Sequence, residues 1–182
     1  MSDHHAADRS HDISQPLDKL SSDERLKADS AQLRGHIAAG LRDQITGAVP
    51  GTDPKLMKFH GIYQQDDRDL RGERARKRLE PAFTFMVRIR LPGGLCSPSQ
   101  WLKIDELARA YGGQTLRLTT RQTFQLHRVL KSNLQRTISG LREVLLDTRA
   151  ACGDDARGVM CSVTPHFSKL HAEVSALAKR AS

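Results

Sequence analysis

The sequence of 182 residues contains few aromatic residues, few cysteines and no long apolar run. Aromatic residues make up 4% of the chain and hydrophobic residues 38%, so we expect part of the chain to lie outside a hydrophobic core. No stretch approaches the roughly 18 apolar residues that a membrane-spanning helix needs. The N-terminal sequence MSDHHAADRSHDISQP lacks the apolar segment of a secretory signal. These absences predict a cytoplasmic protein that has no membrane partner.

The three cysteines exclude a disulfide framework. Their number is odd, and the C-x8-C interval between Cys152 and Cys161 matches no common metal-binding spacing. Free cysteines usually behave as small buried side chains, and we expect the same of Cys96 and its two companions. The sequence therefore predicts no metal ligand in this chain.

Acidic residues are outnumbered by basic ones, which gives a formal net charge of +8 spread along the chain. Such a balance favours an anionic partner, which could be nucleic acid, an acidic protein or a cofactor rich in carboxylates. Nucleic acid is disfavoured, because the basic segments carry no interleaved aromatic residues and no helix-turn-helix, RNA-recognition or zinc-finger pattern is present. We predict that the protein does not bind nucleic acid.

The N-terminal third lacks the pattern of a compact domain. We expect residues 1–20 to form a disordered tail and residues 21–80 a helix followed by an irregular arm. Ser21 and Glu24 form a capping-box pattern at the start of this helix. Apolar residues then recur at helical spacing at Leu26, Leu33, Ile37, Leu41 and Ile45 until GAVPGTDP ends the pattern. The charge-laced segment KFHGIYQQDDRDLRGERARKRLEP reads as a solvated helix or an extended arm.

Residues 81–150 show the order strand, helix, strand pair, helix. The four segments are FTFMVRIRLP, SPSQWLKIDELARAYG, LRLTTRQTFQLHRV and SNLQRTISGLREVLLD, the last with Ser132 as its expected N-cap. A further strand is expected in GVMCSVTP. This order predicts an α+β fold, namely a ferredoxin-like half-domain in which helices cover one face of an antiparallel sheet.

The strand pair at residues 116–129 has one apolar and one polar face. The apolar set holds four residues, Leu116, Leu118, Phe124 and Leu126. The polar set consists of cations and hydrogen-bonding groups without a single carboxylate, at Arg117, Thr119, Arg121, Thr123, Gln125 and His127. A solvated face usually mixes lysine with glutamate, so this composition suggests a binding surface on the open side of the sheet.

The last residues, HFSKLHAEVSALAKRAS, begin another helix whose apolar stripe has scarcely formed when the sequence stops. A domain seldom ends so soon after a new element begins. We therefore expect residues 151–182 to be the incomplete beginning of a second domain within a longer polypeptide.

Four segments in order, KFHGIYQQDDRDLRGER, RIRLPGG, LRLTTRQTFQLH and RGVMCSVTP, resemble the sulfite and nitrite reductase superfamily. The segment YQQDDRD is similar to the NADPH type, so the chain resembles the N-terminal part of the hemoprotein (beta) subunit of assimilatory sulfite reductases. Members reduce sulfite to sulfide with six electrons at a siroheme that is coupled through a cysteine thiolate to a [4Fe-4S] cluster.

The resemblance implies roles for particular residues. Arg88 and Arg157 match the two catalytic arginines that face the substrate anion. Siroheme carries eight carboxylates, and the polar set of residues 116–129 would bind them by charge-assisted hydrogen bonds. Without the resemblance, Arg88 would read as a surface residue, His127 as a structural histidine, and Arg157 as a partner of neighbouring aspartates.

The sequence also departs from the family. The family's cluster ligands lie in C-x5-C and C-x3-C pairs, and neither spacing occurs in these 182 residues. We expect this chain alone to hold no cluster, to bind siroheme weakly and not to reduce sulfite. The implied partners are sulfite and the flavoprotein (alpha) subunit. Two alternatives are a non-catalytic module that docks on that flavoprotein and a fragment of a siroheme nitrite reductase.

Overall fold

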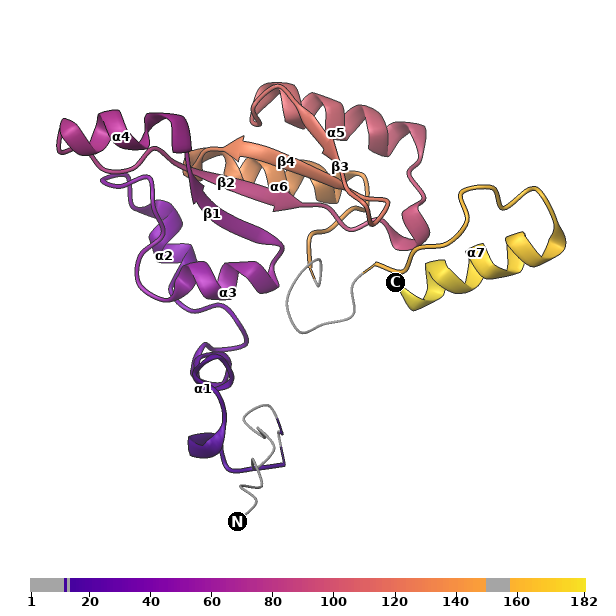
Figure 1. The fold of residues 1–182 in the computed structure, drawn as a ribbon, viewed down its shortest axis with the longest axis horizontal. Coiled ribbons are helices and arrows are strands. Elements are labelled where there is room, and N and C mark those ends of the chain that lie inside the picture. Colours follow the sequence, from indigo (N-terminus) through magenta and orange to yellow (C-terminus); the bar gives the residue numbers. More distant parts are fainter. Residues whose placement is uncertain (1–11, 13, 150–157) are drawn as a thin grey trace, which may run out of the picture.

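The computed structural model describes residues 12, 14–149 and 158–182, and it contains a four-stranded sheet flanked by helices (Figure 1). Every neighbouring pair of strands is antiparallel, and the strand order is β1-β2-β4-β3. The strands are β1 (Ile62–Asp66), β2 (Phe83–Arg88), β3 (Leu116–Leu118) and β4 (Phe124–Val129). The predicted strand over FTFMVRIRLP and the predicted pair at 116–129 are both confirmed.

One face of this sheet is covered by α5 (Pro98–Ala110) and α6 (Leu134–Glu143) (Figure 1). Their buried side chains join those of the central strands in a single core, which includes Ile104 and Leu107 from α5, Leu134 and Leu141 from α6, and Phe85, Val87, Phe124 and Leu126 from the sheet. Apolar burial of this kind is the main stabilising contribution to the fold. The predicted ferredoxin-like half-domain, with helices on one face of an antiparallel sheet, is confirmed.

Capping explains where the two covering helices begin. The Ser97 hydroxyl accepts a hydrogen bond from the Gln100 amide, and the Ser97 amide donates to Gln100 Oε1, which completes a capping box for α5. The predicted cap of α6 by Ser132 is wrong. A 3-10 turn, η3 (Lys131–Asn133), leads into α6, and its N-cap residue Asn133 makes no side-chain cap.

The single helix expected from Ser21 onward is two short helices. A 3-10 turn, η1 (Leu17–Lys19), precedes α1 (Ser22–Asp29), and Ser21 caps α1 as predicted by accepting from the Glu24 amide. The chain then turns through three residues of positive φ, 31–33, before α2 (Ile37–Arg42) begins. Gly35 approaches Asp53 so closely that a Cβ would lie 2.5 Å from its Oδ1, and this packing replaces the continuous helix. Ile45, assigned to the apolar stripe, is 96% exposed.

The charged segment read as a solvated helix or extended arm contains more structure than predicted. After α3 (Asp53–Phe59) it forms β1, which pairs with β2 as one of the two edge strands of the sheet, and then α4 (Arg68–Arg76). The solvated helix is confirmed in α4, which buries none of its residues. The strand was missed because β1 is five residues long and its burial does not alternate cleanly. Such short edge strands carry a weak periodic signal.

The C-terminal segment forms one helix and no strand within the described residues. The strand expected in GVMCSVTP is wrong, because residues 158–164 are irregular. The expected last helix is confirmed as α7 (Lys169–Ala181), with Ser168 as its cap. Its end lies against the 3-10 turn η2 (Pro92–Gly94), where the Gly93 amide donates to Ser182 Oγ at 3.2 Å (Figure 1).

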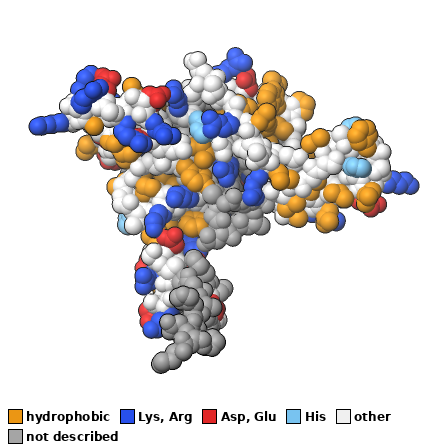
Figure 2. Space-filling view, in the orientation of Figure 1, with side chains coloured by type: hydrophobic (Ala, Val, Ile, Leu, Met, Phe, Trp, Pro, Cys, Tyr) orange, Lys and Arg blue, Asp and Glu red, His pale blue; other side chains and the backbone are white. Residues whose placement is uncertain are grey.

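Lys and Arg side chains are spread over the visible face, from α4 across the sheet to α7, as expected from the charge distribution (Figure 2). In the described part of the chain, no helix combines the length and the apolar character that crossing a membrane requires.

Candidate functional site

The open face of the sheet carries a row of three polar residues on neighbouring strands. In the observed register, Arg88 on β2 lies opposite Gln125 on β4, and Gln125 lies opposite Arg117 on β3. The next row toward the core side pairs Val87 with Leu126 and Leu126 with Leu116. Since successive side chains of a strand point to opposite faces, this register separates the polar set from the core as the alternation predicted.

Gln125 connects Arg88 to His127. Its amide satisfies both neighbours when the oxygen faces the guanidinium and the nitrogen faces the imidazole. In that orientation the Gln125 oxygen accepts from Arg88 Nε at 3.3 Å and Nη2 at 3.0 Å, while the Gln125 nitrogen donates to His127 Nε2 at 3.0 Å. The three side chains therefore form one continuous hydrogen-bond chain across β2 and β4.

The surroundings of His127 favour its neutral form. Burial lowers the pKa of the imidazole, and the positive charge of Arg117 lowers it further. A neutral imidazole has one acceptor nitrogen, and in this network it is Nε2, which receives the Gln125 proton; the ring proton then sits on Nδ1. His127 therefore fixes the direction in which the Gln125 amide points.

Arg88 also contacts the edge strand β1. Its guanidinium carbon lies 5.7 Å from the centre of the Tyr63 ring on β1, within the range of a cation–π contact. The strand missed by sequence reasoning thus supplies one support of Arg88, and Gln125 supplies another. A charged side chain supported from both sides is preorganised to interact with an anion.

Arg88 opens into a pocket of about 260 Å³ at the end of β2. The residues around it include three arginines and several hydroxyl or amide groups, and none of them is acidic: Arg88, Ile89, Arg90, Leu91, Thr119, Thr120, Arg121, Thr123, Gln125 and Gly158. A cavity with this lining is suited to bind an oxyanion, because guanidinium groups match the geometry of carboxylates and related anions.

The structure divides the predicted site residues between two neighbouring depressions. Arg88, Thr119, Arg121, Thr123 and Gln125 line the pocket. Arg117 and His127 instead line an open groove of about 950 Å³ on the same sheet face. Arg157 lies outside the described residues, as do Cys152 and nearly all of the tail at 1–13. Arg90 was not predicted as a site residue, although its alternation with Arg88 was visible in RIRLPGG.

The two threonines of the polar set are engaged in holding the hairpin. Thr119 Oγ1 accepts from the amides of Arg121 and Thr123, both at 3.3 Å, and closes the β3–β4 turn. The Thr123 hydroxyl donates to the Ile89 carbonyl and ties the hairpin to the chain just after β2. Binding of a ligand by these hydroxyls stays a prediction, whereas their part in shaping the pocket wall follows from these bonds.

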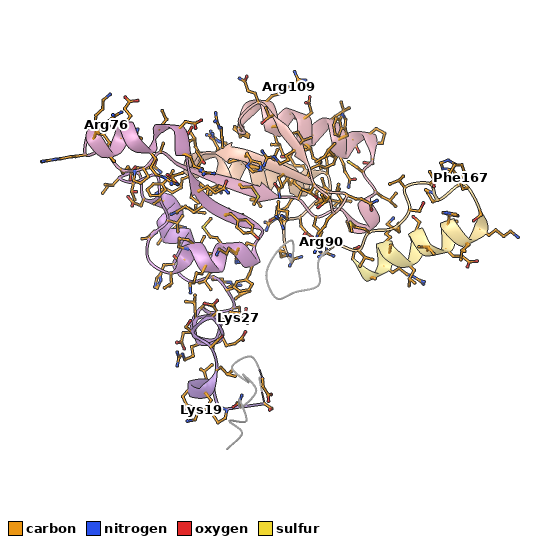
Figure 3. The ribbon with its side chains drawn as sticks, in the orientation of Figure 1. Lys19, Lys27, Arg76, Arg90, Arg109 and Phe167 are labelled. Carbon is orange, nitrogen blue, oxygen red and sulfur yellow. The ribbon has the colours of Figure 1, made fainter. Side chains whose placement is uncertain are left out.

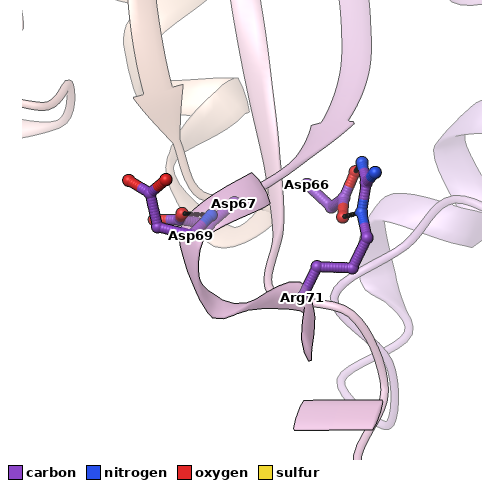
Figure 4. Close-up of polar contacts among 4 residues, drawn as sticks. All are labelled: Asp66, Asp67, Asp69 and Arg71. Atoms are coloured by element: carbon purple, nitrogen blue, oxygen red, sulfur yellow. Dashed lines mark hydrogen bonds and ion pairs between the residues drawn. The ribbon is translucent and has the colours of Figure 1, made fainter. Parts of the chain in front are cut away.

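Three acidic residues, Asp66, Asp67 and Asp69, line the groove together with Arg117 and His127, and each of the first two has a local partner near α4 (Figure 4). Asp66 receives two hydrogen bonds from Arg71, from Nε at 2.8 Å and Nη2 at 2.7 Å, and this pairing lowers the pKa of the Asp66 carboxyl. Asp67 caps α4 by accepting from the Asp69 amide at 3.0 Å. These local partners, expected from the charge pattern of YQQDDRD, leave the pocket arginines without an acidic competitor among the lining residues.

The described cysteines are free thiols. Cys96 and Cys161 are both partly buried, and burial raises the pKa of the Cys96 thiol. In residues 12, 14–149 and 158–182, no three His, Cys, Asp or Glu side chains gather closely enough to hold a metal ion.

Comparison with known proteins identifies relatives of the sheet and of the chain as a whole. Residues 77–144 match the nitrite/sulfite reductase ferredoxin-like half domain. A protein of Nitrobacter hamburgensis named sulfite reductase [NADPH] hemoprotein beta-component is 72% identical over 175 residues. Proteins of the same name from Nitrosomonas europaea and Oceanobacillus iheyensis are 67% and 55% identical. The chain is therefore similar to proteins of the nitrite and sulfite reductase superfamily.

Within this superfamily, the resemblance to the NADPH-type hemoprotein is confirmed by these relatives. The Nitrobacter hamburgensis alignment covers 96% of this chain but 30% of the relative, so the chain spans about 30% of the length of such proteins. A solved structure of the Mycobacterium tuberculosis NirA protein superimposes with a TM-score of 0.67 and 26% identity, over 85% of this chain and 29% of that one.

Proposed function

We propose that this chain forms one wall of the siroheme and sulfite site of a sulfite reductase hemoprotein, in which sulfite is reduced to sulfide with six electrons. The observation that carries this proposal is the pocket that is lined by three arginines and, among the described residues, by no acidic one, with Arg88 held by Gln125. The high identity to hemoprotein beta-components supports sulfite over nitrite as the substrate.

The residues of the sheet face fit a cofactor rich in carboxylates. Arg117 and Arg121 offer planar donor pairs, and Gln125 and His127 add neutral hydrogen-bonding groups beside them. These residues, with Thr119 and Thr123, would hold the siroheme rim. When bound, siroheme coupled to a [4Fe-4S] cluster would supply electrons to the substrate; the C-x5-C and C-x3-C pairs that hold the cluster in the family do not occur in these 182 residues.

The proposed role of Arg88 and Arg157 is to stabilise the negative charge of the substrate. Arg88 would attract the sulfite anion and stabilise the negative charge that accumulates on oxygen as each S–O bond breaks. Gln125 and Tyr63 hold its guanidinium, so little reorganisation is needed when the anion arrives. Arg157 is proposed as its counterpart on the basis of the motif RGVMC.

The electrons would come from NADPH through a flavoprotein subunit in the cytoplasm. The relatives' name, beta-component, implies a partner component. We propose that the segment before the half domain, residues 21–76, contributes to docking, because α1 and α4 lie outside the core and bury none of their residues.

A chimera tests the proposal. In it, this chain replaces the matching 30% of the Nitrobacter hamburgensis relative. We expect it to bind siroheme, seen by its absorption, and to reduce sulfite. Arg88→Met should lower kcat by about 10²- to 10³-fold, as the loss of an oxyanion-stabilising donor does in other enzymes. Arg109→Met is the matched control, because Arg109 is exposed on α5 and pairs with Asp105. A loaded chimera that does not reduce sulfite, or that tolerates Arg88→Met, contradicts the proposal.

A further inference from the structure

Arg90 lies two residues beyond Arg88 and lines the same pocket. Between them, Ile89 is fully buried in the core, so the chain keeps its alternation past the end of β2. The Arg90 backbone is fixed by a bridge to Asp147, whose carbonyl accepts from the Arg90 amide at 2.9 Å. The side chain therefore leaves a rigid point of the fold. Figure 3 shows it beyond the arrowhead of β2, below the sheet.

The Nε group of Arg90 is buried and has no hydrogen-bond partner among the described residues. Buried donors are almost always paired in folded proteins, so such a group calls for a specific explanation. No carboxylate of the described residues forms an ion pair with Arg90; the nearby Asp147 carboxylate accepts instead from the Arg149 amide at 3.1 Å. The missing partner is therefore expected to come from outside the described fold.

Charge in the pocket points in the same direction. Arg88, Arg90 and Arg121 line a pocket of about 260 Å³, and no acidic residue of the described ranges lines it. Like charges that line one pocket repel one another, and an anion bound between them would offset this repulsion. Arg88 already donates hydrogen bonds from Nε and Nη2 to Gln125. By contrast, no side chain of the described residues accepts a hydrogen bond from Arg90 Nε.

We infer that Arg90 is a third anion-binding residue of this pocket, and that its Nε–H group donates directly to an oxyanion. The inference rests on the proposed function and adds to it a residue that the motif comparison did not assign. Two ligands share the required chemistry, a carboxylate of the tetrapyrrole and the sulfite anion itself. Both present oxygen pairs that a guanidinium fork can bind.

Arginine Nε–H resonances of the ¹⁵N-labelled 182-residue chain provide the test. The Arg90→Lys variant keeps the charge and lacks this resonance, so it assigns the Arg90 signal. One titration uses sodium sulfite, and a second uses uroporphyrin, a metal-free tetrapyrrole with eight carboxylates. We expect the Arg90 signal to shift saturably with at least one probe, and the probe that shifts it identifies the ligand. Arg109 on α5 serves as the silent reference (Figure 3).

Affinity gives a second readout that does not depend on activity. Arg90→Met should weaken binding of the responding probe by about 10- to 100-fold, the usual effect of losing a hydrogen bond to a charged group. Shifts of Arg88 and Arg121 without any shift of Arg90 would overturn this inference and leave the proposed function standing. If neither probe shifts the Nε–H resonance of any of the three arginines, the inference and the proposed anion site are both overturned.

Discussion

Arg88 and Gln125 face each other across β2 and β4, and the Gln125 oxygen accepts both Nε and Nη2 of the guanidinium. Arginine has a long side chain that can rotate freely, and this contact fixes the direction in which the Arg88 guanidinium points. If the Gln125 amide turned over, it would lose the two bonds from Arg88, which favours the orientation in which its nitrogen faces His127. The position of Arg88 is thus determined by residues that carry no charge at neutral pH.

Replacing Gln125 by leucine should destabilise the half domain. The change leaves His127 Nε2 and part of the Arg88 guanidinium without their partner in a half-buried position. We expect a loss of about 1–3 kcal/mol in the free energy of unfolding, measured by urea denaturation. Gln135→Leu, on the exposed side of α6, is the control and should change stability by less than about 0.5 kcal/mol. Equal effects of the two changes would show that the bridge contributes nothing.

The stability of the chain should depend on pH through His127. Burial and Arg117 lower the pKa of this imidazole below its ordinary value of 6.5 in the folded state. Between the lowered pKa and 6.5 the unfolded chain binds more protons than the folded one. The free energy of unfolding should therefore rise with pH across this window and be lost as pH falls through it.

His127→Gln provides the comparison for this pH dependence. The difference in unfolding free energy between wild type and variant cancels the titration of the other histidines, which both chains share. Across the groove from His127, the charged groups are Asp66, Asp67, Asp69, Arg68 and Arg128, with Arg117 beside it, and they too are common to both chains. A difference that stays constant below pH 6.5 would contradict the assignment of a neutral, acceptor His127.

Alternation was sufficient to predict the central part of this fold and its polar face. The period-2 pattern at residues 116–129 determines which side chains meet the helices, and the register then brings Arg117, Gln125 and Arg88 together. Such patterns are reliable because shifting a strand by one residue would expose its whole apolar set. The face could be predicted; its hydrogen-bond partners could not, since they depend on the register between strands.

Other features depended on tertiary packing that no local pattern reports. The N-terminal apolar stripe is helical in period, yet the contact between Gly35 and Asp53 interrupts the helix. β1 is stabilised by pairing with β2, and its own sequence, IYQQD, alternates poorly. The proposed role of Arg90 depends on the pocket and on an Nε group without a partner among the described residues, which no local pattern reports.

Truncation of Leu126 tests whether β4 lies at the centre of the core. Leu126 is fully buried, whereas Leu118 on the neighbouring strand is 72% exposed although both belong to the apolar set. Leu126→Ala should cost about 2–5 kcal/mol of unfolding free energy, because it removes buried methyl groups and leaves a cavity. Leu118→Ala should cost less than about 0.5 kcal/mol. Similar losses for both would contradict the observed packing.

The contribution of helix capping to stability can be tested at two serines, Ser97, which caps a helix, and Ser132, which was only predicted to do so. Ser97 accepts from the Gln100 amide at the start of α5, whereas Ser132 is exposed and caps no helix. Thermal or urea unfolding should show a loss of about 1 kcal/mol for Ser97→Ala. Ser132→Ala should be close to neutral. A larger effect at Ser132 than at Ser97 would mean that α6 begins where the sequence predicted.

Gly61 and Gly72 should respond in opposite directions to substitution by alanine. At Gly61, where φ is +71°, a Cβ would lie 2.1 Å from the Thr148 carbonyl oxygen, so the backbone has to shift. We expect Gly61→Ala to cost at least about 2 kcal/mol, from overpacking and from the unfavourable φ. Gly72 lies exposed within α4 with nothing near its Cβ position, and Gly72→Ala should add about 0.5–1 kcal/mol of stability.

The Gly61 variant also reaches the site. The Gly61 carbonyl accepts from the Arg88 amide at 2.8 Å, so a backbone shift at Gly61 displaces the strand end from which Arg88 extends. In the labelled chain, Gly61→Ala should move the Arg88 Nε–H resonance under conditions where the variant remains folded, and Gly72→Ala should leave that resonance in place. A destabilised Gly61→Ala chain with an unchanged Arg88 signal would show that Arg88 is held by Gln125 and Tyr63 alone. In that case the close approach at Gly61 serves the fold, and the geometry of the anion pocket is independent of it.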